Sequence, residues 1–484
     1  MEPQNLRFGG GAPETMLHPL VAVWLLIAIV LMLTRPREQA LVVFLVSCFT
    51  IPVGQVVVLG SLHFTVLRIL ILAGLARRAS FGGSPSRGKF PGGFNPVDQV
   101  VVLWTVSALV ILSLQWMNMQ ALIHNLGDFL DAIGGYLVVR FLIPDGNAIR
   151  RTIKVFAVIC VIQGVCMTNE QIIHRNIFGY LGGMPLTVTV RDGKIRSEGV
   201  MGCLYAGVFA GVVIPMFLWL WTRGKSRLLA CAGLAGATAM VITSNSSTSW
   251  MAIAGSVVGL AFWPLRKQMR LVCWGFALIL LVLHLVMKGP VWSLIARVDL
   301  TGSSSSYHRY YLLDNCIRHF SDWWLLGYKY YNTWGWSMWD LCNQFVVVAL
   351  LGGLLTLVFY VAIFSRSFRA IGKARKLVNG DRGREWLLWC LGADLFANVV
   401  AHFGINYMAQ MMMSLFPLLA CISVTTFEVK RVAIRSTRET VRSVETSEEL
   451  QLVATLAAED THEWPTEKTD EARQNFFAVG RRLI

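Results

Sequence analysis

Apolar residues recur along the chain in runs long enough to cross a membrane, separated by short polar connections. A transmembrane helix needs about 20 predominantly apolar residues, and this criterion predicts about thirteen spans. They lie at residues 17–33, 40–59, 62–76, 97–116, 121–143, 149–167, 200–221, 228–243, 247–263, 271–287, 341–364, 386–403 and 407–425. The run 40–59 contains Ile51-Pro52-Val53-Gly54, and we expect it to be kinked or broken there. The pattern predicts an all-α polytopic membrane protein with about 12–13 transmembrane helices.

Lys and Arg gather in alternate connections, near residues 35–37, 77–89, 150–151, 223–227, 266–270 and 366–384. Short cytoplasmic loops collect basic residues, so the alternation puts the N-terminus and the longest loop outside and the C-terminus inside. We therefore expect a polytopic transmembrane domain at residues 1–427 and a charged cytoplasmic tail, flexible or weakly helical, at residues 428–484. The first residues lack a basic region and a cleavage site, so we expect no cleaved signal peptide.

Composition supports the membrane class and excludes others. Hydrophobic residues make up 55% of the chain and charged residues only 15%, well below the roughly 25% of a soluble domain. The net charge of +15 is spread over short connections, so we expect no nucleic-acid partner. The ten Cys have no CxxC spacing, which predicts neither a disulfide framework nor a zinc site. We expect no metal and no cofactor, because no carboxylate pair is arranged to hold a cation.

Two polar loops carry basic residues although the positive-inside rule assigns these loops to the outside. The basic residues of these loops therefore need another explanation. In the first, residues 169–199, alternating β-branched residues around Asp192-Gly193 predict a hairpin turn. Arg191 and Lys194 lie at that turn, and Arg196 lies on the exit towards the next span.

The second loop, residues 288–340, is the stretch around which the chain is organised. It holds six Trp, and disordered segments are poor in aromatics, so we expect a large folded extracytoplasmic loop. Its Ser-rich start suits a helix N-terminus. Tyr307, Asp314 and Arg318 follow at helical spacing, which predicts a short amphipathic helix at the membrane surface.

Basic loops facing a membrane suggest an anionic, membrane-held substrate, because the planar guanidinium of Arg grips phosphate oxygens in pairs. Each Arg has a structural alternative, such as an ion pair of Arg318 with Asp314 or Asp322. The loop aromatics suit either a membrane-interface belt or contact with sugar rings. Candidate substrate contacts are Arg191, Lys194, Arg318, Lys329, Tyr307 and Trp336. His308 and His402 are placed where a base would be useful.

These features together resemble the O-antigen ligase and O-antigen polymerase superfamily of bacterial envelope glycosyltransferases, over about residues 196–423. The similar segments are IRSEG at residues 195–199, the Thr/Ser turn at residues 243–250, and SSSSYHRYYLL in the long loop. The positions that match the family pattern further on are Arg309, Gly327, Asn343, Gly352 and Gly353. Where the ligases carry a His just before the Asn, this sequence has Cys342, so Asp340, His308 or His402 would supply the base.

The resemblance implies a GT-C-like fold in the bacterial inner membrane with an extracytoplasmic active site. It implies metal-independent transfer of a glycan from an undecaprenyl-diphosphate-linked donor to an acceptor hydroxyl, either on lipid A–core in O-antigen ligation or on a growing glycan in surface polysaccharide polymerisation. Arg196 and Arg309 would hold the diphosphate, whose charge grows as the glycosidic bond breaks, and Asn343 would contact substrate. The alternative function is a transporter or flippase of lipid-linked saccharide, which would also use outer basic residues.

Overall fold

A computed structural model describes residues 15–60, 62–80, 90, 92–224, 226–297, 305–378 and 380–459. The chain divides into a compact unit that ends at Val429 and a second unit that begins at Lys430. Parts of the sequence predictions lie outside the described residues. These are the first residues of the chain, the basic residues Arg87, Lys89 and Lys225, the serines at 303 and 304, and the tail from residue 460.

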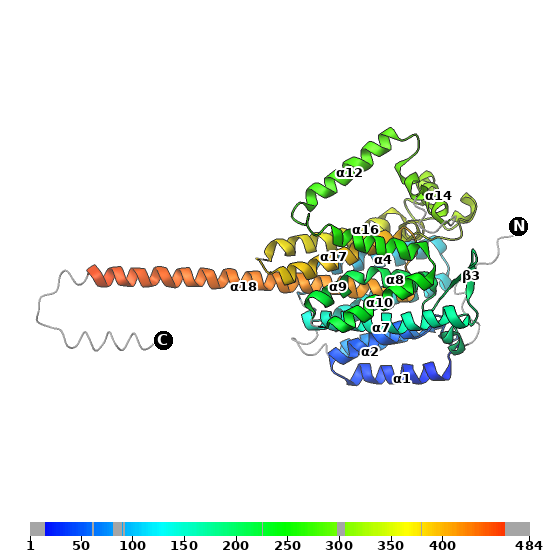
Figure 1. The fold of residues 1–484 in the computed structure, drawn as a ribbon, viewed down its shortest axis with the longest axis horizontal. Coiled ribbons are helices and arrows are strands. Elements are labelled where there is room, and N and C mark those ends of the chain that lie inside the picture. The colour runs from blue at the N-terminus through cyan, green and yellow to red at the C-terminus, as the bar shows by residue number, and fades with distance from the viewer. Residues whose placement is uncertain are drawn as a thin grey trace, which may run out of the picture. The chain divides into compact units, whose positions relative to one another are not determined.

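The first unit is built almost entirely of helices (Figure 1). Its first half contains α1 Pro19–Thr34, α2 Arg37–Thr50, α3 Val66–Ser80, α4 Pro96–Trp116, α5 Met119–Phe129, the π-helical turn η1 Leu130–Gly134, α6 Gly135–Leu142 and α7 Gly146–Ile173. Its second half contains α8 Cys203–Val212, α9 Ile214–Arg223, α10 Arg227–Ser244, α11 Ser247–Ala261, α12 Met269–Val286, α16 Gln344–Leu377, α17 Arg382–His402 and the start of α18 Met412–Glu459. The structure therefore confirms the all-α class.

Among the described residues, seven helical segments are long and apolar enough to cross a membrane. They are Pro96–Trp116, Gly146–Ile173, Cys203–Arg223, Arg227–Ser244, Met269–Val286, Gln344–Leu377 and Met412–Glu439. The chain is a multi-pass membrane protein. The other predicted spans correspond to shorter helices, to helix pairs, or to α17, which has 21 residues but is not among the seven. Of the shorter helices, Pro19–Thr34 and Ser247–Ala261 are apolar, so the count of thirteen stays a prediction.

The connections between helices gather at two ends of the first unit. At one end, Arg151 pairs with Glu38 at 2.6 Å and Arg266 pairs with Glu385 at 3.1 Å. We call this the basic end. At the other end, the Gln55 amide donates to the carbonyl oxygen of Leu181 at 2.6 Å, and Gln115 donates to Leu326 at 3.2 Å. We call this the loop end, because both polar loops lie there.

Two antiparallel hairpins lie at the loop end. The hairpin β3 Thr189–Arg191 with β4 Lys194–Arg196 turns at Asp192 and Gly193, as the sequence predicted. The hairpin β1 Val56–Leu59 with β2 Leu62–Thr65 was not predicted. The helix that precedes it ends at Thr50, two residues before Pro52. The predicted break is thus confirmed, but the expected spans 40–59 and 62–76 were wrong at residues 56–65, where β-branched residues pair as strands.

The long loop is folded over its described residues. It contains η3 Val291–Ser293, α13 Leu294–Arg297, α14 Ser305–Arg318, α15 Phe320–Trp323 and η4 Tyr331–Trp334. The helix predicted after the Ser-rich start is therefore confirmed as α14. Trp323 is buried, and its indole donates to the carbonyl oxygen of Cys316 at 2.7 Å. This contact packs α15 against α14.

The loop is fixed to the bundle where α16 breaks. Gly353 has φ 65° and ψ −175°, which interrupts the helical hydrogen bonds. The carbonyl oxygen of Leu350 accepts from the backbone of Tyr328 at 2.7 Å, and the amide of Leu354 donates to Trp324 at 2.8 Å. Backbone groups released by the break are therefore satisfied by the loop, as a non-helical segment at membrane depth requires.

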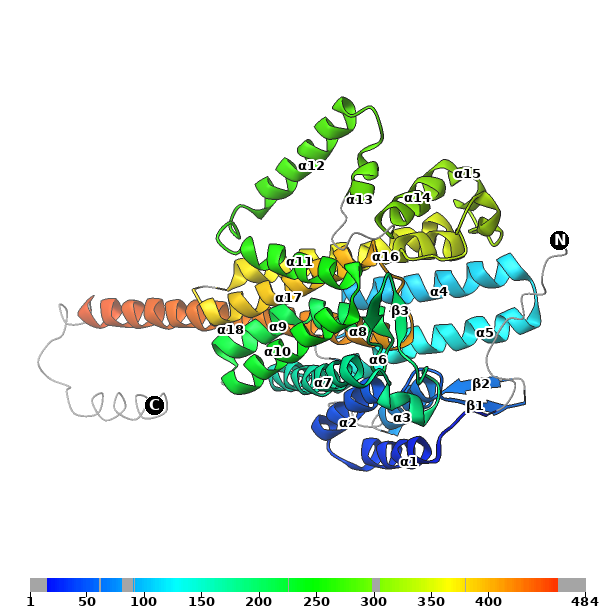
Figure 2. The ribbon, with the colours of Figure 1, turned by 45° about the vertical axis from the view of Figure 1, so that its right-hand side comes forward.

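Helix α12 is packed differently from the other long helices. None of its residues is buried, and large apolar residues are exposed on every face, for example Leu271, Trp274 and Val286. Figures 1 and 2 both show it standing apart from the neighbouring helices of the first unit. A helix that is apolar all round and unburied by protein is suited to a lipid environment.

The second unit contains the rest of α18, from Lys430 to Glu459. The sequence predicted a flexible or weakly helical tail, whereas its described part is a continuous helix.

Candidate functional site

The centre of the candidate site is Arg309, on α14. Its side chain is 4% exposed and contacts the start of α11. One terminal nitrogen donates to the hydroxyls of Ser247 and Thr248 at 2.8 and 2.9 Å, and the other contacts the Met251 sulfur at 3.3 Å. The Thr/Ser turn at residues 243–250 thus holds this guanidinium. Because a helix N-terminus is itself electropositive, the arrangement concentrates positive charge and favours an anion.

His308, the residue before Arg309, meets the segment that leads into α16. Its Nε2 lies 2.9 Å from the carbonyl oxygen of Asp340 and 3.9 Å from the carboxylate of the same residue. A carbonyl oxygen can only accept a hydrogen bond, so Nε2 carries a proton, and in the neutral imidazole the lone pair then lies on Nδ1. That nitrogen is shielded from solvent and has no hydrogen-bond partner among the described residues. His308 is therefore arranged as a base, with the Asp340 carboxylate beside it to stabilise an imidazolium.

Cys342 lies in the same place but cannot serve as the base. Burial raises the pKa of its thiol to about 12; Asp340 also raises this pKa, and Arg309 lowers it. A thiol with that pKa is neutral at physiological pH and is a poor proton acceptor. Because Asp340 and Arg309 both change the pKa of Cys342, both charged groups lie near its thiol.

Arg196, at the end of β4, approaches the site from the other polar loop. The carbonyl oxygen of its neighbour Ile195 accepts from the Asn245 amide at 2.6 Å, so the strand lies against the turn whose next residues bind Arg309. Arg196 acts electrostatically on Cys203 at the start of α8. Its side chain makes no hydrogen bond or ion pair with another described residue.

Tyr205 was missed by the sequence analysis. It lies on α8, donates to the Asn406 side chain at 3.1 Å, and is within the electrostatic reach of Asp340. A tyrosine near the start of an apolar helix carries no distinguishing sequence signal, so only the fold could reveal this contact.

The structure brings His308 and Asp340 into contact and buries Arg309, the next residue of α14, against α11. It places most of the predicted substrate contacts elsewhere. Arg318 is 69% exposed and pairs with Asp314 at 2.7 Å within α14. This is one of the two ion pairs that the sequence offered as an alternative to substrate binding. Arg191 is half exposed and lies 3.8 Å from Asp192, and Lys194 is exposed. Tyr307 and Trp336 are exposed at the loop surface.

Two further predicted contacts have structural roles. The Lys329 amine donates to the carbonyl oxygen of Gln115 at 3.4 Å and lies 5.0 Å above the Trp116 ring. Asn343 is buried, and its side chain caps α16 by accepting from the amides of Phe345 and Val346. Asn343 thus positions the segment that carries Asp340 and Cys342.

His402 belongs to a polar network inside the bundle. It is fully buried, with Nε2 2.7 Å from the Tyr360 hydroxyl and Nδ1 2.5 Å from the carbonyl oxygen of Asn398. Asn398 in turn contacts Asp394 at 2.8 Å and the Tyr407 hydroxyl at 2.9 Å. Both ring nitrogens of His402 are engaged, so of the three candidate bases the geometry favours His308.

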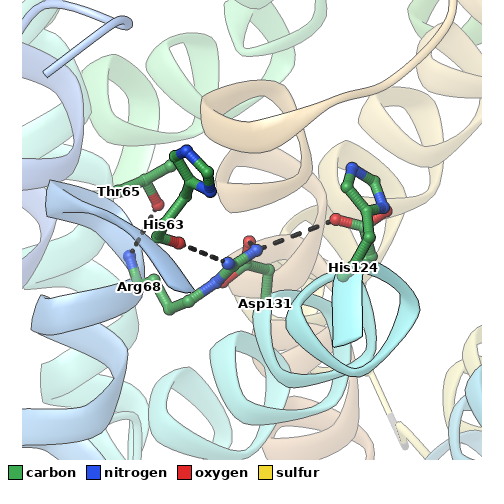
Figure 3. Close-up of polar contacts among 6 residues, drawn as sticks. His63, Thr65, Arg68, His124 and Asp131 are labelled. Carbon is green, nitrogen blue, oxygen red and sulfur yellow. Dashed lines mark hydrogen bonds and ion pairs between the residues drawn. The ribbon is translucent and has the colours of Figure 1, made fainter. Parts of the chain in front are cut away.

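A second polar cluster joins α3 to α5 (Figure 3). The guanidinium of Arg68 makes two parallel hydrogen bonds to the Asp131 carboxylate, at 3.0 and 2.7 Å, and a third to the carbonyl oxygen of His63 at 2.8 Å. His124 pairs with Asp128 at 3.3 Å. Asp131 lies in the π-helical turn, a feature that recurs at functional sites. The sequence analysis missed this cluster, because its members are distant in sequence or separated by apolar residues.

Comparison of the sequence with protein-family models and with characterised proteins finds no match.

Proposed function

We propose that this protein is a metal-independent membrane glycosyltransferase that moves a glycan from a polyprenyl-diphosphate carrier to an acceptor hydroxyl on the extracytoplasmic side. The observation that carries the proposal is the contact of His308 with Asp340 next to the buried guanidinium of Arg309 at the loop end. A base with a free lone pair and a buried guanidinium lie on adjacent residues of α14. The positive-inside rule places the loop end outside.

The geometry supports a simple division of labour. His308 Nδ1 accepts the proton of the acceptor hydroxyl as that oxygen forms its bond to the anomeric carbon, and Asp340 stabilises the resulting imidazolium. The bond between the anomeric carbon and the diphosphate oxygen breaks at the same time, and negative charge grows on the leaving lipid diphosphate. Arg309, with Arg196 beside the same turn, stabilises that charge. The donor is a polyprenyl-linked glycan such as undecaprenyl diphosphate carries, and the acceptor is a growing glycan or lipid A–core.

The test is glycan transfer by the purified full-length protein, with a lipid-linked donor and an acceptor. We expect His308→Gln to lower the rate by about 10²-fold or more and Arg309→Met by about 10²–10³-fold. His319→Gln and Arg318→Gln are matched controls, because both residues lie in the same part of the loop and pair with nearby carboxylates, Asp322 and Asp314, away from Asp340. Both controls should keep near wild-type rates.

The proposal fails if His308→Gln and Arg309→Met fold normally and transfer glycan at the rates of their controls. Activity that EDTA abolishes and Mg²⁺ restores would instead refute metal independence. Product length separates the two acceptors, because a polymerase yields a ladder of repeats and a ligase yields a single addition to lipid A–core.

A second candidate function is movement of a lipid-linked saccharide across the membrane. Ionisable residues within the helical bundle favour it, namely the Arg68–Asp131 pair and the buried pair of Arg140 with Asp98 at 3.2 Å, since such residues mark transport pathways. Flipping of a labelled lipid-linked saccharide in proteoliposomes, without covalent change to it, would identify this function.

A further inference from the structure

Four arginines from three helices converge at the basic end. Arg37 of α2 lies over the Phe141 ring, with its central carbon 4.1 Å from the ring centre. Arg140, the residue before Phe141, lies 5.5 Å above the ring of Phe90, and Arg78 of α3 lies 4.4 Å above the same ring. Two aromatic rings thus hold three guanidiniums close together.

Arg77 is the fourth member. It is 3% exposed, and its guanidinium donates to the carbonyl oxygen of Met32 near the end of α1. Arg77 and Arg140 both repel Arg37 electrostatically, and Asp145 attracts it. The positive charges of Arg37, Arg77 and Arg140 are therefore close enough for Arg77 and Arg140 to repel Arg37.

Two carboxylates lie against these arginines, and both have other partners. Asp98 is 1% exposed and is bound by Arg140 and by the Tyr136 hydroxyl. Asp145 caps α7 by accepting from the amide of Ala148 at 2.8 Å. The four guanidiniums and two carboxylates sum to a charge of +2.

Arg37 has donors available for a ligand. Its Nε and one of its terminal nitrogens are shielded from solvent and have no hydrogen-bond partner among the described residues. Buried donors without acceptors are unfavourable, and phosphate oxygens suit the two-pronged geometry of a guanidinium. We propose that the cluster of Arg37, Arg77, Arg78 and Arg140 binds a phosphate group at the basic end, carried by an anionic membrane lipid or free in solution.

The experiment measures the melting temperature of the full-length protein in neutral detergent. Added phosphatidylglycerol is compared with added phosphatidylcholine, and inorganic phosphate is compared with sodium chloride at matched ionic strength. The variants are Arg37→Gln and, as a matched control, Arg35→Gln, which removes an exposed charge two residues away. We expect phosphatidylglycerol or phosphate to stabilise the wild type and Arg35→Gln, and whichever of the two acts identifies the source of the phosphate group.

For Arg37→Gln we expect apparent affinity for that anion to fall by about tenfold or more, the scale of a lost charge-assisted hydrogen bond. Without the anion this variant should melt at or above the wild type, because repulsion from Arg77 and Arg140 is relieved. A purely structural Arg37 would give the opposite result, a lower melting temperature with an unchanged anion response.

Three outcomes overturn the proposal. The wild type shows no shift specific to an anion, Arg37→Gln keeps the wild-type shift, or Arg37→Gln melts well below the wild type before any anion is added. If Arg37→Gln does not fold, Arg78→Gln takes its place with the same expected loss of anion response, and an unchanged response then overturns the proposal.

Discussion

The break in α16 predicts that Gly353→Ala is strongly destabilising. The φ of 65° and ψ of −175° at Gly353 lie in a region that is essentially restricted to glycine, and an L-residue there costs about 1–3 kcal/mol. An added Cβ would also lie 2.6 Å from the carbonyl oxygen of Leu325, a backbone atom that cannot turn away. The substitution therefore strains both α16 and the loop that docks on it.

Relief of the clash requires the loop to move away from α16. That movement gives up the hydrogen bonds of Tyr328 with Leu350 and of Leu354 with Trp324, each a contribution of about 1 kcal/mol. Strain and lost bonds together give an expected destabilisation of about 3–5 kcal/mol. The loop carries Arg309 and His308, so glycan transfer should fall as well.

The matched control is Gly372→Ala, in the same helix. A Cβ at Gly372 meets nothing within 4 Å, and alanine is favoured over glycine in a helix by about 0.8–1 kcal/mol. This control should melt at or slightly above the wild type. Thermal unfolding in detergent measures both variants, and limited proteolysis reports whether the loop has detached. If Gly353→Ala melts like the wild type and its loop is equally resistant to protease, the account of the break is wrong.

Three further predictions concern other parts of the first unit. Cys342→Ser should keep glycan transfer. Alkylation of Cys342, followed by peptide mass spectrometry, should be slow at pH 8 and should accelerate about tenfold per pH unit up to the thiol pKa of about 12. Fast labelling at pH 8 would contradict this prediction. Asn343→Ala should cost about 1 kcal/mol through loss of the α16 cap, with Asn343→Asp recovering most of it in the same melting assay. Gly127→Ala should displace Arg68, because a Cβ at Gly127 would lie 2.6 Å from its guanidinium. It should therefore lower stability in the wild type but cost little more in an Arg68→Ala background, which has already lost the Asp131 ion pair; equal costs in the two backgrounds would contradict the clash.

Local sequence signals predicted the local structure well. Apolar runs gave the helices, Asp192-Gly193 gave the hairpin turn, and Pro52 gave the end of α2. Each depends on residues that are neighbours in the chain, and such signals are readable without the fold. The wrong prediction at residues 56–65 has the same origin, because a short apolar run of β-branched residues fits a buried helix or a strand equally well on hydropathy alone.

The sequence was less informative about which polar residues meet. Arg318 and Arg309 lie on the same short helix, yet Arg318 is exposed and pairs with Asp314, whereas Arg309 is buried against α11. Helical spacing suggests the first contact, since the two residues are four apart. The second joins residues that are 62 apart in the sequence, and no local pattern encodes it. The candidate site is built from contacts between residues that are distant in the sequence. The sequence therefore indicated candidate residues but not which of them lie together.

The two anchors of α14 explain how a loop of this length can hold a reactive pair in place. Arg309 ties one side of α14 to the start of α11, and the break in α16 fixes the segment that follows α15. Helix α12, which leads into the loop, has no buried residue and contributes little to this placement. Because the anchors belong to the packed bundle, His308 and Asp340 are held by the bundle, and α12 can adapt to the surrounding lipid without moving them.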